Sequence, residues 1–96
     1  MYTARNATTT RTAVSAATPT TIKADNAGLR GWVLFNDTAS DLYVLAGSGT
    51  PSTTNFTWKV PAAQHLQEPA SDAIYIGPLQ VYSTPGGNVN LTLFTI

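Results

Sequence analysis

Apolar and polar residues alternate along much of this chain with the period of a β-strand, and no stretch of about eleven residues or more has the spacing of an amphipathic helix. The clearest alternation lies just past the middle of the chain, where Phe56, Trp58 and Val60 share one face and Thr57 and Lys59 share the other. We expect the first three side chains in a core and the other two in solvent.

Other segments rich in β-branched and aromatic residues are separated by clusters of Gly, Pro, Asn, Asp and Ser, which favour turns. The strands expected besides 55–60 lie at 29–35, 42–46, 74–76, 79–83 and 89–96. We expect the first two of these to pair as a hairpin. Many short strands with frequent turns predict an all-β protein, an antiparallel β-sandwich or a jelly-roll-like barrel, formed by residues 28–96.

Residues 1–27 differ from this module in composition. They hold eight of the sixteen Thr residues but only Val14 and Ile22 as branched apolar residues, too few to bury a core of their own. We expect an extended N-terminal arm that is disordered when free and ordered by a partner, with Arg5 and Arg11 able to pair with acidic groups there. The alternative is that this segment adds a first strand to the chain's own sandwich.

The strands expected at 29–35 and 42–46 carry apolar side chains on both faces. A strand in a two-sheet sandwich buries one face, so the second face needs a cover. The arm or a neighbouring subunit supplies it, and we favour a subunit because only 10% of the residues are charged. We therefore expect a homo-oligomer, in the first place a trimer, with a dimer as the alternative. The side chains expected at interfaces are Arg5, Arg11, Val14, Ile22, Trp32, Leu34, Tyr43 and Leu45.

Charge and cysteine content narrow the classes of function. Five basic and five acidic residues give zero net charge, which argues against binding nucleic acid or an anionic membrane surface. The chain has no cysteine, no apolar segment approaching the ~20 residues that span a bilayer, and no apolar signal-peptide segment at its start. We expect no disulfide, no thiolate metal site and no membrane span.

Candidate catalytic and metal-binding residues are few. His65 and Glu68 fall on opposite faces of a strand, so they do not form a pair. Asn36, Asp37 and Asp41 offer oxygen atoms to a cation, but their spacing does not match a calcium-binding loop, and turn formation explains them more simply. We expect no enzymatic activity, no metal and no cofactor.

Most aromatic side chains lie in expected strands. An exposed row of Trp and Tyr would stack on sugar rings, as in a carbohydrate-binding module, whereas aromatic residues in strands more often belong to a core. Trp32 and Trp58 are the residues whose substitution would test glycan binding.

The run Leu29-Arg-Gly-Trp-Val-Leu-Phe-Asn-Asp-Thr-Ala-Ser-Asp-Leu-Tyr-Val44 leads from one strand through a polar turn into a second. The chain continues with Ser52-Thr-Thr-Asn-Phe-Thr-Trp-Lys-Val60, a Pro-Ala-Ala-Gln turn and Ile76-Gly-Pro-Leu79. Over residues 22–95 this pattern of strand and turn residues resembles small structural proteins of tailed bacteriophages.

The resemblance implies a virion protein that is assembled in the cytoplasm of a host bacterium and has no catalytic residues. Because the arm and the module make up almost the whole chain, we expect a capsid decoration or cement subunit that binds the major capsid protein, or other virion proteins, across capsomer junctions. A head-to-tail, tail or fibre component is the alternative within this class. A carbohydrate-binding adsorption module is the alternative from a different class.

Overall fold

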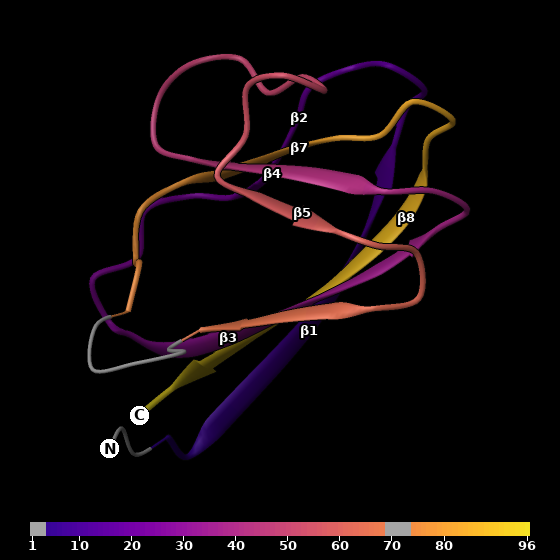
Figure 1. Ribbon diagram of the computed structural model, residues 1–96. Helices are drawn as coiled ribbons and strands as arrows, with labels where there is room; N and C mark the ends of the chain where they lie inside the picture. The colour runs from indigo at the N-terminus through magenta and orange to yellow at the C-terminus, as the bar shows by residue number, and fades with distance from the viewer. Residues whose placement is uncertain (1–3, 69–73) are drawn as a thin grey trace.

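The computed structural model describes residues 4–68 and 74–96, in which β-strands are joined by turns and loops (Figure 1). The strands are β1 (Asn6–Val14), β2 (Thr20–Lys23), β3 (Leu29–Thr38), β4 (Leu42–Ala46), β5 (Trp58–Val60), β6 (His65–Glu68), β7 (Leu79–Tyr82) and β8 (Gly87–Thr95). No described residue is helical, so the expectation of an all-β protein is confirmed. The strand expected at 74–76 is absent, because residues 74–78 form an irregular segment.

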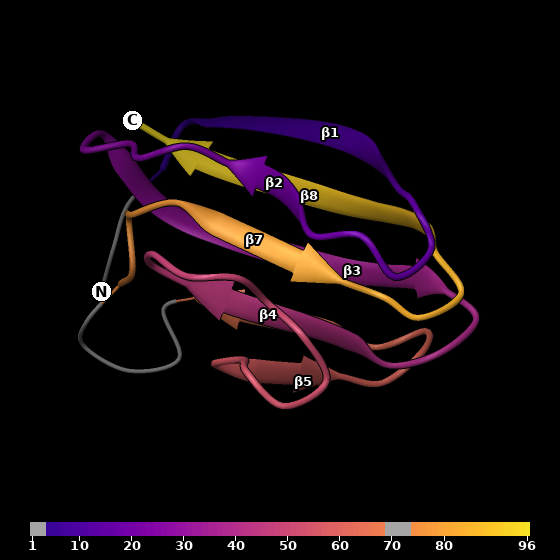
Figure 2. The ribbon, with the colours of Figure 1, turned by 90° about the horizontal axis from the view of Figure 1, so that it is seen from above.

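The strands form two antiparallel sheets of four, with the orders β1-β8-β3-β6 and β2-β7-β4-β5, and Figure 2 shows one sheet layered over the other. Every connection except that between β4 and β5 crosses from one sheet to the other. The expected hairpin of β3 with β4 is therefore wrong, because β3 pairs with β8 and β6 while β4 pairs with β7 and β5. Turn residues indicate where the chain reverses, but not which strand lies beside which.

The core lies between the two sheets and takes side chains from both. Trp32 and Leu34 of β3 and Leu42 and Val44 of β4 are fully buried there. The remaining buried apolar members of this cluster are Val14, Leu29, Val60, Leu79, Val81, Val89 and Leu91. Burial of the inward set of each strand is what holds the two sheets together.

The strand around Trp58 confirms part of its expected register. Val60 is buried, Trp58 packs against the core with its ring 5.8 Å from that of Trp32, and Thr57 and Lys59 are exposed. Phe56 is the exception, since it precedes β5 and is 39% exposed, so its expected place in the core is wrong. Alternation orders side chains only while the chain remains a strand.

The expected N-terminal arm is not confirmed. β1 pairs with β8 along nine residues, from Asn6 opposite Thr95 to Val14 opposite Gly87, and β2 pairs with β7. Most of β1 is exposed, so backbone hydrogen bonds to β8, rather than buried side chains, hold it in place. The structure agrees with the alternative in which this segment adds to the chain's own sheets.

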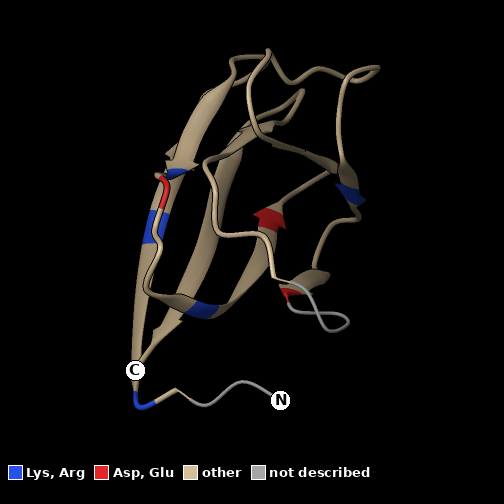
Figure 3. Cartoon of the chain, turned by 90° about the vertical axis from the view of Figure 1, so that its left-hand side faces the viewer, with Lys and Arg blue, Asp and Glu red and all other residues tan. Residues whose placement is uncertain are grey.

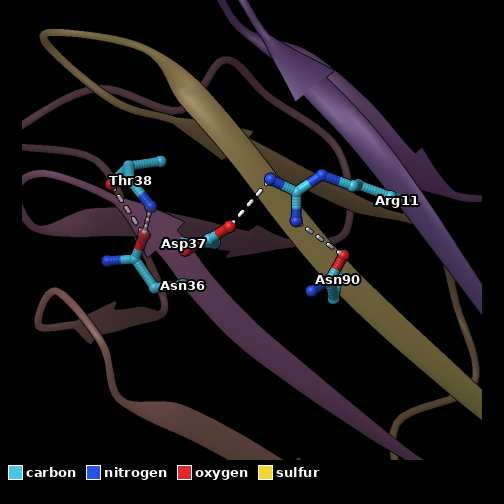
Figure 4. Close-up of polar contacts among 5 residues, drawn as sticks. All are labelled: Arg11, Asn36, Asp37, Thr38 and Asn90. Carbon is cyan, nitrogen blue, oxygen red and sulfur yellow. Dashed lines mark hydrogen bonds and ion pairs between the residues drawn. The ribbon is translucent and has the colours of Figure 1, made fainter.

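Asn36 is the polar centre of the fold, fully buried on the inward face of β3. Its amide nitrogen donates hydrogen bonds to the carbonyl groups of Ser40 and Val60, both at 2.8 Å. Its amide oxygen accepts from the backbone N–H of Thr38 at 2.9 Å and from the Thr38 hydroxyl at 2.6 Å (Figure 4). One side chain thus ties the turn after β3 to β5 in the opposite sheet.

Two further side chains anchor the irregular segment 74–78. The indole N–H of Trp32 donates to the carbonyl of Tyr75 at 2.9 Å. The Lys23 ammonium, buried at the end of β2, donates to three backbone carbonyl groups, those of Ala24 (3.1 Å), Ile76 (2.8 Å) and Gly77. Burial lowers the pKa of Lys23 below its ordinary value of 10.5, and the negative charge of Asp25 opposes this in part.

Candidate functional site

Within residues 4–68 and 74–96, no three side chains of His, Cys, Asp or Glu gather as metal ligands do. His65 is exposed on β6, opposite Phe35 in the sheet. Asp37 is engaged by Arg11 and Asp41 by Lys59. The features left to describe as candidate sites are therefore the outward faces of the two sheets and their edges.

On the outward face of the first sheet, polar side chains contact one another across neighbouring strands. The guanidinium of Arg11 on β1 lies 2.8 Å from the carboxylate of Asp37 on β3 and 3.3 Å from the amide oxygen of Asn90 on β8 (Figure 4). At the next outward position along β1 and β8, the hydroxyl groups of Thr9 and Thr92 are 2.8 Å apart. These contacts join three neighbouring strands and neutralise the single charge of β1.

The outward face of the second sheet carries an aromatic group that we call the aromatic face, consisting of Tyr43, Phe56 and Tyr82. Tyr43 on β4 and Tyr82 on β7 are directly opposite in register, and the ring of Phe56 lies 5.2 Å from that of Tyr43. Lys59 is opposite Tyr43 on its other side and 3.7 Å from Asp41. Rings beside charged groups of this kind suit a partner surface that is both apolar and polar.

The loop between β4 and β5 covers the part of this sheet next to the aromatic face. The side-chain amide of Gln80 donates to the carbonyl of Gly49 at 2.9 Å, which holds the loop over Leu45. Leu45 is only 8% exposed as a result. The chain itself therefore covers Leu45, one of the two side chains on the second apolar face of β4, whereas Tyr43 on the same face remains half-buried in the aromatic face.

The eight residues expected at interfaces fall into two groups. Those that are closed off inside the chain are Val14, Trp32, Leu34 and Leu45, with exposures of 3%, 0%, 0% and 8%. Their burial argues against contact with a partner. The sequence could not place Trp32, Leu34 and Leu45, because both faces of their strands are apolar and the inward face cannot then be told from the outward face. Those with exposed or half-buried side chains are Arg5, Arg11, Ile22 and Tyr43, of which Ile22 packs against the core.

Phe56 and Tyr82 belong to the aromatic face but were not among the candidates from the sequence. The signal for Tyr82 was its alternation with Leu79 and Val81 along β7. Those two side chains are fully buried, and Tyr82 lies on the opposite, outward face. For Phe56 the sequence indicated the opposite side. Of the two Trp residues proposed for sugar stacking, Trp32 is fully buried, and Trp58 is half-buried with its ring centroid 5.8 Å from that of Trp32.

Among the described residues, those of one charge sign are spread over several strands and loops rather than gathered in one place (Figure 3). The described part of the chain contains no candidate for a membrane-spanning helix. Comparisons of the chain with protein families, with curated proteins and with solved structures each found no match.

Proposed function

We propose that this chain is a structural subunit of a bacteriophage virion, and specifically a capsid decoration subunit. The observation that carries the proposal is the strand order. Two four-stranded antiparallel sheets with the orders β1-β8-β3-β6 and β2-β7-β4-β5, connected almost throughout by crossings between sheets, support an eight-stranded jelly-roll sandwich. Jelly rolls recur in viral capsid and lectin domains, so the fold supports the class by analogy.

The outward faces support a binding role rather than a chemical one. On the first sheet, Arg11, Asp37 and Asn90, and the pair Thr9 and Thr92, are engaged in polar contacts across strands, while the second sheet presents the aromatic face. A stable protein–protein interface takes about 800 Å² from each partner. The chain has 5225 Å² of accessible surface, so such an interface would use about 15% of it and leave room for contacts with two capsomers.

The proposed mechanism is mechanical. A subunit seated across the junction of two capsomers adds buried interface that must be broken before the capsomers separate. No group needs to react, and the stiffness of the two hydrogen-bonded sheets transmits load between the contacts.

The test is the copy number of this chain in purified virions, measured by quantitative mass spectrometry against the major capsid protein. A decoration subunit is present on the order of hundreds per particle, whereas a tail, portal or fibre ring contains roughly three to twelve copies. The low number would replace the decoration role by the tail alternative. Absence from the particle would overturn the virion assignment.

A second candidate function rests on the aromatic face. Tyr43, Phe56 and Tyr82 present rings beside Lys59 and Asp41, which is the combination that stacks on a sugar ring and hydrogen-bonds its hydroxyls. A glycan array probed with the full chain tests adsorption to carbohydrate. Binding that is lost in Tyr43→Ala and Tyr82→Ala, but kept when exposed Thr54 on the loop is replaced by Ala, favours this function. Binding to capsids alone favours the decoration role.

A further inference from the structure

β1 is an edge strand whose second side is open. It is the outermost member of the order β1-β8-β3-β6, and no strand in the described parts of the chain pairs with its free side (Figure 2). All nine of its residues pair with β8 in a single register without a bulge. It therefore presents a long, uninterrupted row of backbone hydrogen-bonding groups.

The other three sheet edges carry the usual protection against pairing, and β1 does not. β5 and β6 have three and four residues, and β2 has four residues, a register shift and Pro19 just before it. Edge strands are normally blunted by shortness, Pro, bulges or free charges. β1 contains no Pro, and its one charge, on Arg11, is already neutralised by Asp37 at 2.8 Å.

The backbone direction of β1 can be followed through the sheet. Asn36 of β3 donates its N–H to the carbonyl of Gln64, so it is directed toward β6 and its neighbours in β3 are directed toward β8. The alternation continues through the register of β3 with β8 and then through that of β8 with β1. Every second residue of β1 is therefore directed to the open side. These residues are Ala7, Thr9, Arg11 and Ala13.

The strand is complementary to itself. When two copies of β1 run antiparallel, all nine residues overlap only if Thr10 faces Thr10 of the second copy. Thr8 then faces Thr12, Ala7 faces Ala13 and Thr9 faces Arg11. Thr side chains meet on the face that carries Thr8, Thr10 and Thr12, and Thr–Thr pairs across strands are stabilising. A shift by one residue in each copy toward the C-terminus would place Arg11 opposite Arg11, which like charges disfavour.

We propose that β1 is a dimerisation strand, through which two copies of this chain join edge to edge about a two-fold axis at Thr10 and form one continuous eight-stranded sheet. The occupant of the open side is a second copy because in this register all nine residues overlap, Thr side chains meet across the axis, and each Arg11 faces Thr9 while it stays paired with Asp37 of its own chain. The inference concerns the isolated chain and does not rest on the proposed function. Two-fold pairing yields the dimer, not the trimer that the sequence favoured.

Cysteine cross-linking in the full chain tests the register, since the natural sequence has no cysteine. In the proposed dimer the Thr10 pair is a non-hydrogen-bonded pair with Cα atoms about 4.5 Å apart, within disulfide range. Thr10→Cys is therefore expected to form a covalent dimer on mild oxidation. Thr12→Cys is the matched control. In the proposed dimer the introduced thiol groups of the two chains would lie about 14 Å apart, so this variant should remain monomeric on a non-reducing gel. Equal cross-linking of the two variants would overturn the proposed register.

Sedimentation at micromolar concentration tests the dimer without chemistry. The unmodified chain and Thr10→Ser are expected to be dimers, and Thr10→Lys, which places two ammonium groups opposite each other at an exposed position, is expected to raise the dissociation constant by at least about tenfold. Unchanged melting of Thr10→Lys when diluted to a monomer would show that the fold is intact. A monomeric unmodified chain, or an oligomer that Thr10→Lys leaves unchanged, would overturn the proposal; a monomer would leave the open edge to a different protein.

Discussion

Replacement of Asn36 by Leu is the substitution that most directly tests how the two sheets are joined. Leu has the branched shape of Asn and keeps the core filled, but it removes four hydrogen bonds. Three of these are buried, but the Thr38 hydroxyl also lies 2.8 Å from the carbonyl of Ser40 and keeps that partner. The buried groups that lose the Asn36 side chain without this compensation are the carbonyl of Val60 and the N–H of Thr38.

The expected cost follows from those two groups. A buried polar group that loses its partner costs about 1–3 kcal/mol, so the pair costs about 2–6 kcal/mol. Apolar burial of Leu offsets part of this, and we expect a net loss of about 3 kcal/mol. In a domain of this size that corresponds to a fall in melting temperature of about 12–24 °C.

Urea unfolding followed by tryptophan fluorescence measures this loss, because Trp32 and Trp58 pack together beside the core and become exposed on unfolding. Asp37→Asn is the matched control. Asp37 is the next residue in β3, faces outward, and makes an exposed ion pair with Arg11, so its substitution should cost no more than about 1 kcal/mol (Figure 4). Equal losses in the two variants would refute the role of Asn36 as the link between the sheets.

Further outcomes follow from the same packing. Trp32→Ala is expected to cost about 3–5 kcal/mol, because Trp32 is fully buried and its indole N–H binds the carbonyl of Tyr75, whereas Phe56→Ala at a 39% exposed position should cost under about 1 kcal/mol. Thermal unfolding ranks the two, and the reverse order would contradict the core described above. Deletion of residues 1–15 removes β1 and leaves β8 as an edge, so we expect loss of cooperative unfolding by circular dichroism. A truncated chain that melts at the original temperature would mean that β1 is dispensable for the fold. Because burial lowers the pKa of Lys23 in the folded chain below 10.5, the unfolded chain binds more protons between the two pKa values, and stability rises with pH through that window. As pH approaches 10.5, the free energy of unfolding of the original chain should therefore rise relative to that of Lys23→Met. A difference between the two chains that does not change with pH would contradict this.

Local pattern was sufficient for the class of the fold. β-branched and aromatic residues at alternate positions, interrupted by Gly, Pro and Asn, predict strands and turns because each depends on backbone preferences of neighbouring residues. Alternation also placed Val60 inward and Thr57 and Lys59 outward, since a strand reverses its side chains at every residue.

The residues of the candidate sites could be predicted only in part from alternation and turn residues. Tyr43 was among the expected surface residues, but Phe56 and Tyr82, which complete the aromatic face, were not. Their position depends on where β5 begins and on which face of the second sheet meets the first. Both are decided by contacts between segments distant in sequence, which no local pattern contains.

Tertiary structure alone decided the role of the N-terminal segment and of Asn36. β1 has little apolar surface of its own, yet it belongs to the first sheet because β8, some eighty residues along the chain, offers a matching row of hydrogen-bonding groups. Asn36 lies where the sequence indicates a turn residue, but burial against the second sheet makes it the link to Val60. The sequence by itself determined strands and turns, which are local; pairing and burial are properties of the whole chain, and the free energy of the assembled sheets selects them.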